Sequence, residues 1–267
     1  MENYKVISLS DDGEFIVTNS FLKLYETLKS LKNTKGRIIA VIGAPGVGKS
    51  SNIFHALNVL DLNVYEPILL MKNIDKSPEE VYVKIFNTLK KDMKVKTENE
   101  VFDKFSKFDA VLVADKFLDS EFLDPSKAGL ARWTDSKGIM SFPLFFLWIF
   151  EYLIHKKDLK KVNLVFQTAW TIQIKGFKYD LITDFGVFSE LVAGILKMLF
   201  EVVEIKYEES ETIKIVKSHF KNISDEEIKL CIKKYGNKPR FILSALEGES
   251  KTVKTSKSYI KTTGLAD

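Results

Sequence analysis

A glycine-rich stretch, GAPGVGKS at 43–50, is the feature of this sequence that most constrains its fold. It follows the apolar, β-branched run RIIAVIG at 37–43, which predicts a fully buried strand. We expect a helix to begin near Lys49 and to continue through NIFHAL. A strand, a glycine loop and a helix in this order match G-x-x-x-x-G-K-[ST], in which the backbone curls so that several N–H groups point inward.

This loop is a candidate site for the phosphates of a nucleoside triphosphate, because inward N–H groups and the positive end of a helix both favour anions. Lys49 would reach the β- and γ-phosphates, and the Ser50 hydroxyl would coordinate Mg²⁺. The predicted binding residues are Gly43, Ala44, Pro45, Gly46, Val47, Gly48, Lys49, Ser50 and Ser51.

A second candidate follows the apolar run AVLVAD at 110–115, a predicted strand that ends in Asp115. A carboxylate at a strand end beside such a loop predicts a second Mg²⁺ contact. The next residue is Lys116, which cannot act as a general base while protonated. Nearby acids that could replace a second carboxylate are Asp119, Glu121 and Asp124, and the sequence does not choose among them.

Three further polar residues are candidates for the same site. Gln167 and Thr168 end the predicted strand VNLVFQT at 162–168, where a side chain can position water or satisfy the backbone. Arg240 follows Pro239 in the first turn of a predicted helix and could point back at the triphosphate. The run NKPR at 237–240 is not a guanine-binding motif, because Arg240 occupies the position where that motif has an aspartate.

Strand and helix patterns alternate through the first three quarters of the chain, which predicts an α/β fold with a mostly parallel sheet between helices. The expected strands are 37–43, 62–70, 110–115 and 162–168, with two short strands around a turn at 4–17. The expected helices are one capped by Asn19 or Ser20, one at 77–93 that begins with Ser77 and Pro78, and an apolar one at 143–155.

After EVVEIKY at 201–207 the pattern changes to three short helices, which predicts a small helical lid. The middle helix opens with the capping box Ser224-x-x-Glu227 and ends at Gly236. We therefore expect a P-loop domain at 1–205, a lid at 206–248 and a loose tail rich in Lys, Ser and Thr at 249–267.

Composition narrows the remaining classes of function. With 45% hydrophobic and 28% charged residues, the chain is typical of a soluble globular protein. The single cysteine, Cys231, excludes an internal disulfide framework, and the three histidines have no zinc-site spacing. The apolar run at 142–150 is too short to cross a bilayer. With no signal peptide in the first residues, we expect a cytoplasmic protein without a membrane role.

This set of features resembles the AAA+ superfamily, and in particular its compact archaeal ATPases related to origin-recognition and DnaA-like initiators and to STAND signalling ATPases. The residues that carry the resemblance are GAPGVGKS, AVLVAD, Gln167 with Thr168, and the lid sequence that ends in Gly-Asn-Lys-Pro-Arg. The resemblance implies ATP as the nucleotide, Arg240 as the sensor-2 arginine and Gln167 or Thr168 as the sensor-1 residue. The lysine-rich, arginine-poor composition also resembles proteins of crenarchaeal viruses or plasmids.

The sequence departs from that family in three respects. Lys116 occupies the position of the catalytic glutamate. No arginine lies between 168 and 240 to act as a finger on a neighbouring subunit, which leaves Arg132 as the remaining candidate, since Arg37 precedes the first core strand. The segment 249–267 is too short for a winged-helix DNA-binding domain.

We therefore expect slow ATP hydrolysis coupled to lid closure on DNA or a protein partner, in replication of a viral or plasmid genome. The alternatives are an ATP-dependent binding switch or signalling scaffold with essentially no turnover, and a small-molecule kinase. DNA contacts would come from the Arg132 loop or from the tail, and a homo-oligomer is open as well. Lysines that would share one face of a helical tail are Lys251, Lys254, Lys257 and Lys261.

Overall fold

The computed structural model describes residues 14–66, 78–107, 109–119, 153–169, 171–174 and 177–248. Several predicted features lie outside these residues. They are the first part of the expected strand pair at 4–17, the acids Glu121 and Asp124, the Arg132 loop, the apolar run at 142–150 and the tail at 249–267. Predictions about them stay predictions.

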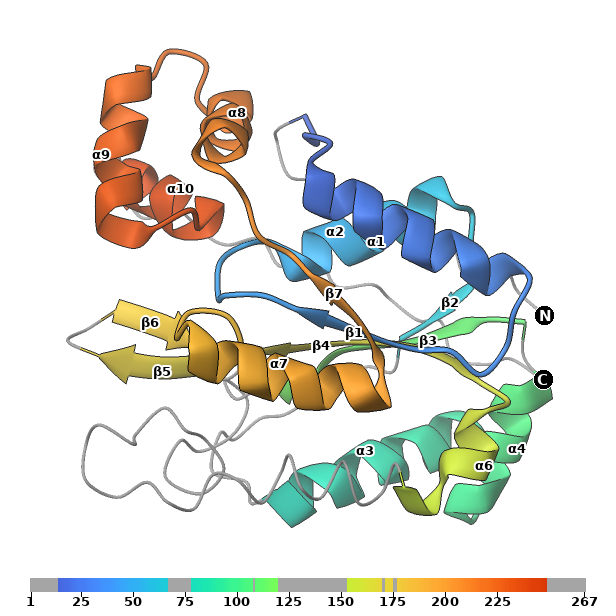
Figure 1. Ribbon diagram of the computed structural model, residues 1–267. Helices are drawn as coiled ribbons and strands as arrows, with labels where there is room; N and C mark the ends of the chain where they lie inside the picture. Colours follow the sequence, from blue (N-terminus) through green and yellow to red (C-terminus); the bar gives the residue numbers. More distant parts are fainter. Residues whose placement is uncertain are drawn as a thin grey trace.

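A parallel sheet of five strands forms the centre of the N-terminal part (Figure 1). The strands lie in the spatial order β2-β3-β4-β1-β7, and neighbouring strands all pair in parallel. Their bounds are β1 (Ile38–Ile42), β2 (Val64–Tyr65), β3 (Val111–Asp119), β4 (Asn163–Ala169) and β7 (Glu201–Glu204). Because β1 lies inside the sheet, the loop that follows it emerges beside the carboxyl ends of its neighbours.

Helices cover both faces of this sheet (Figure 1). On one face lie α1 (Asn19–Lys29), which continues into η1 (Ser30–Lys32), and α2 (Lys49–Val59). The other face carries α3 (Pro78–Asp92), α4 (Glu98–Lys107), α6 (Lys156–Leu159) and α7 (Val187–Leu199). The predicted α/β class, with a mostly parallel sheet between helices, is confirmed.

The main core lies between β1 and the helix pair α1 and α2, because these elements supply apolar residues on matching sides. Leu24 and Leu28 of α1 and Leu57 of α2 are fully buried against Ile39 and Val41 of β1. Burial of this kind, at roughly 25 cal/mol per Å² of apolar surface, is the main term that fixes α2 against the sheet. The start of α2, and with it the glycine-rich loop, therefore has a fixed position.

Three short helices at the C-terminal end form a lid with a core of its own (Figure 1). They are α8 (Glu209–His219), α9 (Asp225–Tyr235) and α10 (Pro239–Gly248). Val216, Ile228 and Ile242, one from each helix, are fully buried together. The predicted capping box between Ser224 and Glu227 is present, and Gly236 ends α9 in a left-handed conformation with φ 72°.

Several local predictions were wrong. Thr18, rather than Asn19 or Ser20, caps α1, because its hydroxyl accepts from the backbone N–H of Phe21. Residues 14–17 form no strand. The sequence-based expectations did not include the helices α4 and α7. They also did not include the antiparallel hairpin formed by β5 (Thr171–Ile174) and β6 (Phe177–Asp180). Among the residues that the structure describes, no helix has the length and apolar character needed to span a bilayer.

Candidate nucleotide-binding site

The glycine-rich loop joins the end of β1 to the start of α2, as the motif requires. Gly46 and Gly48 have φ of 88° and 77°, a region that residues with a side chain rarely adopt. Gly43 also has no room for a side chain, because a Cβ there would lie 2.6 Å from the carbonyl oxygen of Ile205. The backbone is therefore curled in front of α2, whose first N–H groups have no partner within the helix.

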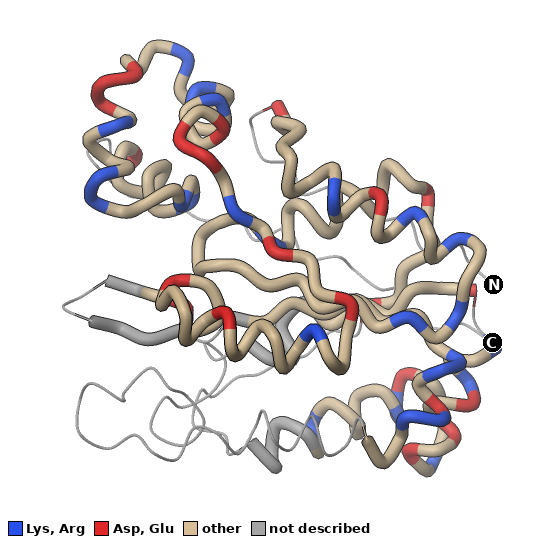
Figure 2. Tube along the Cα trace, in the orientation of Figure 1, with Lys and Arg blue, Asp and Glu red and all other residues tan. Residues whose placement is uncertain are grey.

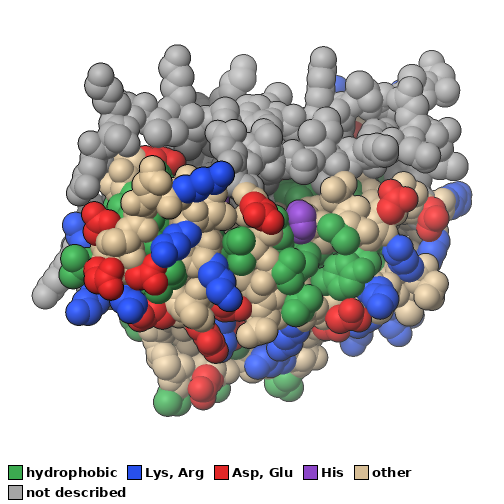
Figure 3. Space-filling model, turned by 90° about the horizontal axis from the view of Figure 1, so that it is seen from above, with side chains coloured by type: hydrophobic (Ala, Val, Ile, Leu, Met, Phe, Trp, Pro, Cys, Tyr) green, Lys and Arg blue, Asp and Glu red, His purple; other side chains and the backbone are tan. Residues whose placement is uncertain are grey.

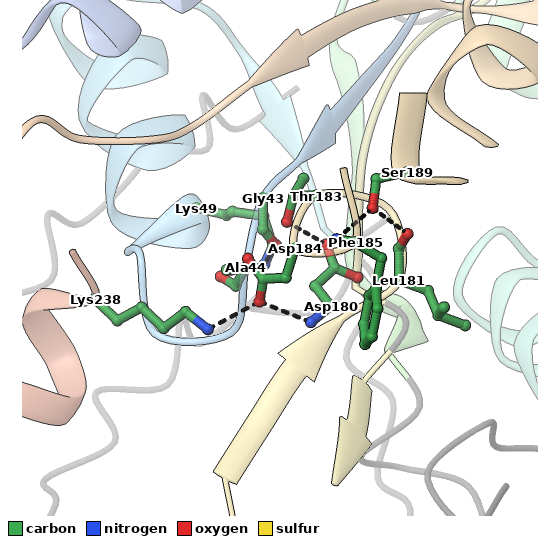
Figure 4. A network of polar contacts seen from close by, with 10 residues as sticks. All are labelled: Gly43, Ala44, Lys49, Asp180, Leu181, Thr183, Asp184, Phe185, Ser189 and Lys238. Carbon is green, nitrogen blue, oxygen red and sulfur yellow. Dashed lines mark hydrogen bonds and ion pairs between the residues drawn. The ribbon is translucent and has the colours of Figure 1, made fainter. Parts of the chain in front are cut away.

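Lys49 is the first residue of α2, and only 8% of it is exposed. Its Nζ donates to the carbonyl oxygen of Gly43 at 2.8 Å and to that of Ala44 at 3.4 Å. Figure 4 shows the side chain beside these two residues. The ammonium group is thus kept at the loop.

Gln167 of β4 reaches the hydroxyl predicted to hold Mg²⁺. Its Nε2 donates to Ser50 Oγ at 3.1 Å. The contact follows from the register of the sheet, in which Gln167 lies opposite Val41 of β1 and Thr168 lies opposite Ile42. Both Gln167 and Thr168 are buried. The structure therefore brings two of the predicted site residues, 117 positions apart in the chain, into direct contact.

Asp115 does not end its strand, which corrects the sequence-based expectation. β3 continues to Asp119 after a shift in register, with Ala114 opposite Phe166 and Leu118 opposite Thr168. Four steps along β3 match two along β4, so extra residues bulge between them. The backbone of Asp115 therefore lies on β3, the strand next to β4, which carries Gln167. The side chains of residues 115–119 are outside the described part, so the roles of Asp115 and Lys116 stay predictions.

The lid touches the glycine-rich loop directly. The backbone N–H of Arg240 donates to the carbonyl oxygen of Gly46 at 3.0 Å. The ring of Phe241 lies against the same glycine, where a Cβ would be 3.3 Å from it. The Arg240 side chain itself is exposed, so its predicted contact with the γ-phosphate stays a prediction.

A second lid contact lies beside the first. Lys238 Nζ forms an ion pair with Asp184 Oδ2 at 2.9 Å, and both side chains are largely buried, with 13% and 20% exposed. The same Oδ2 accepts from the backbone N–H of Asp180 at 2.9 Å (Figure 4). Lys238 Nζ also lies 5.3 Å from the centre of the Tyr179 ring. The lid is therefore joined to the segment that follows the hairpin β5–β6.

The linker between β7 and the lid is held by partly buried hydrogen bonds. Asn52 Nδ2 donates to the Gly48 carbonyl and to the Tyr207 hydroxyl, both at 2.8 Å. Burial raises the pKa of the Tyr207 hydroxyl to about 12. The Ser20 hydroxyl donates to the Lys206 carbonyl at 2.6 Å and accepts from the Lys206 N–H at 3.2 Å. Tyr207 thus connects the linker to the helix that begins at the glycine-rich loop.

A cavity of about 450 Å³ lies between the glycine-rich loop, the linker and the lid. Ala44, Tyr207, Lys238 and Phe241 are among the residues that line it. Its volume is in the range of small-molecule sites. A ligand in it would touch the P-loop domain and the lid at once.

Sequence reasoning missed four residues that shape this region: Asn52, Asp184, Tyr207 and Lys238. Lys238 belongs to the NKPR run, but its partner is 54 positions away, and Tyr207 meets Asn52 across 155 positions. Contacts over such separations leave no periodic pattern in a single sequence. Pro239 was the one local signal in this region. Proline is common at the first position of a helix, so it marks the start of α10, where the lid contacts the loop.

No family model matches the chain, and no curated protein matches it either. Solved structures with a similar fold include a DNA replication initiation factor (TM-score 0.43, 20% identity, 88% of this chain and 61% of that one). DnaA from Aquifex aeolicus bound to AMPPCP (0.42, 18%, 88% and 64%) and Drosophila ORC bound to DNA (0.45, 14%, 85% and 53%) are also similar.

This chain therefore spans less than two thirds of the length of those proteins. At these identities and scores the similarity assigns no function. The architecture is that of a P-loop α/β domain with a parallel sheet between helices, followed by a small helical lid.

Proposed function

We propose that this chain binds ATP with Mg²⁺ at residues 43–51 and hydrolyses it slowly, as an AAA+-like ATPase. The observation that carries the proposal is the convergence of three groups at the start of α2. Lys49 lies within the curled loop, Ser50 follows it, and Gln167 donates to the Ser50 hydroxyl from the neighbouring strand. A cation, a metal-binding hydroxyl and a polar group on the strand beside β1 are the parts that a triphosphate site needs.

The proposal includes a magnesium ion. Ser50 and Asp115 are the proposed oxygen ligands, a donor set that suits a small hard cation which retains several water molecules. When bound, Mg²⁺ supplies positive charge that neutralises the phosphate oxygens. The protein's own part is to hold the phosphates with the N–H groups of the loop and the Lys49 ammonium, and to orient water with Gln167 or Thr168.

Lid closure is the proposed output. The lid already contacts Gly46 through the backbone of Arg240, so a phosphate in the loop would lie close to the lid. The Arg240 guanidinium would bind the γ-phosphate and hold the lid closed until that phosphate leaves. A ligand shifts such an equilibrium only by its difference in affinity for the two states.

The effector of that closure is DNA or a protein partner in genome replication. The resemblance to initiator ATPases and the lysines of the tail support this part of the proposal. Figure 3 shows positive and negative side chains interspersed over the face formed by α1, α2 and the lid. That described face has no uniformly basic surface, so contacts to DNA phosphates are assigned to residues 249–267 or to Arg132.

Calorimetric titration with MgATP tests nucleotide binding. Lys49→Ala should weaken ATP binding by about 100-fold or more, because it removes the buried ammonium that would pair with the phosphates within the loop. Lys23→Ala, which changes an exposed lysine of α1, is the matched control and should bind as the wild type does. Unchanged affinity in Lys49→Ala would contradict the proposal.

Lys116 favours a second candidate, a nucleotide-dependent switch with essentially no turnover. A phosphate-release assay with and without DNA separates the two functions. If Lys116→Glu raises turnover strongly, the wild-type protein is held slow at this residue. No release from either protein, with ATP binding intact, would support the switch.

A further inference from the structure

Helix α7 carries apolar side chains on its outer side as well as on its inner side. Ser189, Ala193 and Leu196 are buried against the sheet. A helix that is apolar all round is normally covered on both sides. The outer set, called the α7 stripe below, consists of Val187 (83% exposed), Phe188 (44%), Leu191 (64%), Ile195 (43%) and Met198 (85%).

From Phe188 on, the members of the α7 stripe recur every three or four residues, and Val187 lies four residues before Leu191, so all five lie on one side of the helix. Gly194 lies beside them, and a Cβ at this position would meet nothing within 4 Å. Figure 2 shows α7 as a mostly uncharged segment on the outside of the molecule. Midway along the helix, the edge of the stripe thus has space for another helix to approach closely.

The charges at the edge of the stripe indicate what covers it. Glu190 and Lys197 are both exposed and lie on the same edge, seven residues apart. At 1.5 Å per residue they are about 10 Å apart along the axis, too far to pair with each other. Suppose that two copies of α7 pack side by side, antiparallel and related by a two-fold axis. The edge that carries Glu190 and Lys197 in one copy then meets the same edge of the other copy, which runs in the opposite direction. Each Glu190 then lies opposite Lys197 of the other copy.

We propose that a second copy of this chain covers the α7 stripe, in an antiparallel α7–α7 pair with its two-fold axis near Ala193 and Gly194. This interface is self-complementary, as a two-fold interface requires. It buries the apolar side chains of both copies and pairs the edge charges in two places. The proposal does not depend on nucleotide binding, because no residue of the stripe lies in the glycine-rich loop or the lid.

The first test measures the mass of the full-length protein by sedimentation across a range of concentrations. The wild type should form a dimer at high concentration. Glu190→Lys should weaken dimerisation by about tenfold or more, since it places like charges opposite each other, and Lys197→Glu should do the same. Restored dimerisation in the double charge reversal is expected only if the two residues meet across the interface.

Glu226→Lys, an exposed charge reversal on α9, is the matched control and should not change the mass. Circular dichroism of each variant checks that it is folded. A monomer at every concentration would overturn the proposal, and this is the result expected if another part of the same chain or a different protein covers the stripe. A double reversal that fails to restore the dimer would overturn the antiparallel arrangement.

The second test is disulfide cross-linking in a Cys231→Ser background, which removes the only native thiol. Gly194→Cys lies near the two-fold axis and should cross-link two copies on oxidation. Val187→Cys should not, because its two copies would be about 20 Å apart along the helix axes, beyond the reach of a disulfide. Cross-linking by Val187→Cys with none by Gly194→Cys would contradict the antiparallel pair.

Discussion

The lid is attached to the P-loop domain in two places, and the chemistry of the two differs. The hinge side, around Lys206, Tyr207 and Glu211, uses hydrogen bonds to Asn19, Ser20 and Asn52. The latch side, around Lys238, Arg240 and Phe241, uses one ion pair, one backbone hydrogen bond and two ring contacts. Both sides join residues distant in sequence, but the hinge side includes the linker through which the chain enters the lid, whereas the latch side has no covalent connection to the P-loop domain.

The difference indicates which attachment opens. The hydrogen bonds of the hinge side are partly buried or exposed, but the chain itself runs through this side and holds it together. The ion pair of the latch side is also partly buried, and no covalent connection there prevents its two groups from separating into water. The latch side also includes Gly46, which belongs to the proposed phosphate site. We therefore expect the lid to stay fixed at its hinge side and to open and close at its latch side, under control of the nucleotide.

Gly46→Ala should have the largest effect, because it changes the latch side and the loop together. A Cβ at φ 88° is strained and would lie 3.3 Å from the Phe241 ring. We expect a loss of about 1–3 kcal/mol in the free energy of unfolding and weaker ATP binding. Denaturant unfolding measures the first quantity. As a control, Gly194→Ala in open space within a helix should stabilise the protein by about 0.5–1 kcal/mol.

Ser20→Ala should come next, since it removes both hydrogen bonds to Lys206 on the hinge side. The expected loss is about 1–2 kcal/mol, because a partly buried carbonyl and N–H lose their partner. Ser218→Ala, whose hydroxyl bonds only the carbonyl of Ile215 within its own helix, should change stability little. An equal effect of the two variants would contradict a special role for the hinge side.

Tyr207→Phe should lower the free energy of unfolding by about 1 kcal/mol near neutral pH, which is the usual net value of one hydrogen bond. The wild type carries a further pH dependence. Its unfolded state releases the tyrosine proton near pH 10 and its folded state near pH 12, so stability falls as pH rises through that window. The difference in stability between wild type and Tyr207→Phe should therefore shrink between pH 10 and 12. A constant difference would show that Tyr207 is not buried.

Asp184→Asn should have the smallest effect on global stability, about 0.5–1 kcal/mol, because the charge of the ion pair is lost while an amide oxygen can still accept from Lys238 and from the N–H of Asp180. The effect of Asp184→Asn on the opening of the latch side should be clearer than its effect on global stability. The amide of Arg240 should exchange with deuterium a few times faster, since about 1 kcal/mol corresponds to roughly fivefold in an equilibrium. Lys229→Gln, which removes an exposed lysine from the lid, is the control and should leave that exchange rate unchanged.

The sequence predicts features that depend on neighbouring residues and fails on those that depend on distant ones. The glycine-rich loop, β1, α2 and the capping box of α9 follow from local patterns, and the structure contains each of them. The start of α4 has the same kind of signal, which was overlooked. Thr97 accepts from the N–H of Glu100, whose carboxylate accepts from the N–H of Thr97.

The contact of Gln167 with Ser50 was within reach of sequence reasoning, because strand ends of a parallel sheet meet at one edge. The continuation of β3 past Asp115 was not, since a bulge depends on how far the neighbouring strand extends. The pairs Asn52–Tyr207 and Asp184–Lys238 need the lid to be placed in space first. For α7, an apolar pattern on every side obscured which face is buried.

Hydrogen–deuterium exchange with and without MgATP tests the central claim most directly, because it follows the loop and both lid attachments in one experiment. The account predicts that MgATP slows exchange at the backbone amides of residues 43–51 other than Pro45, which has no N–H, and at Arg240 on the latch side. Lys206 on the hinge side should be protected in both states. If MgATP leaves the amides of residues 43–51 unprotected, the claim that this loop binds nucleotide is contradicted.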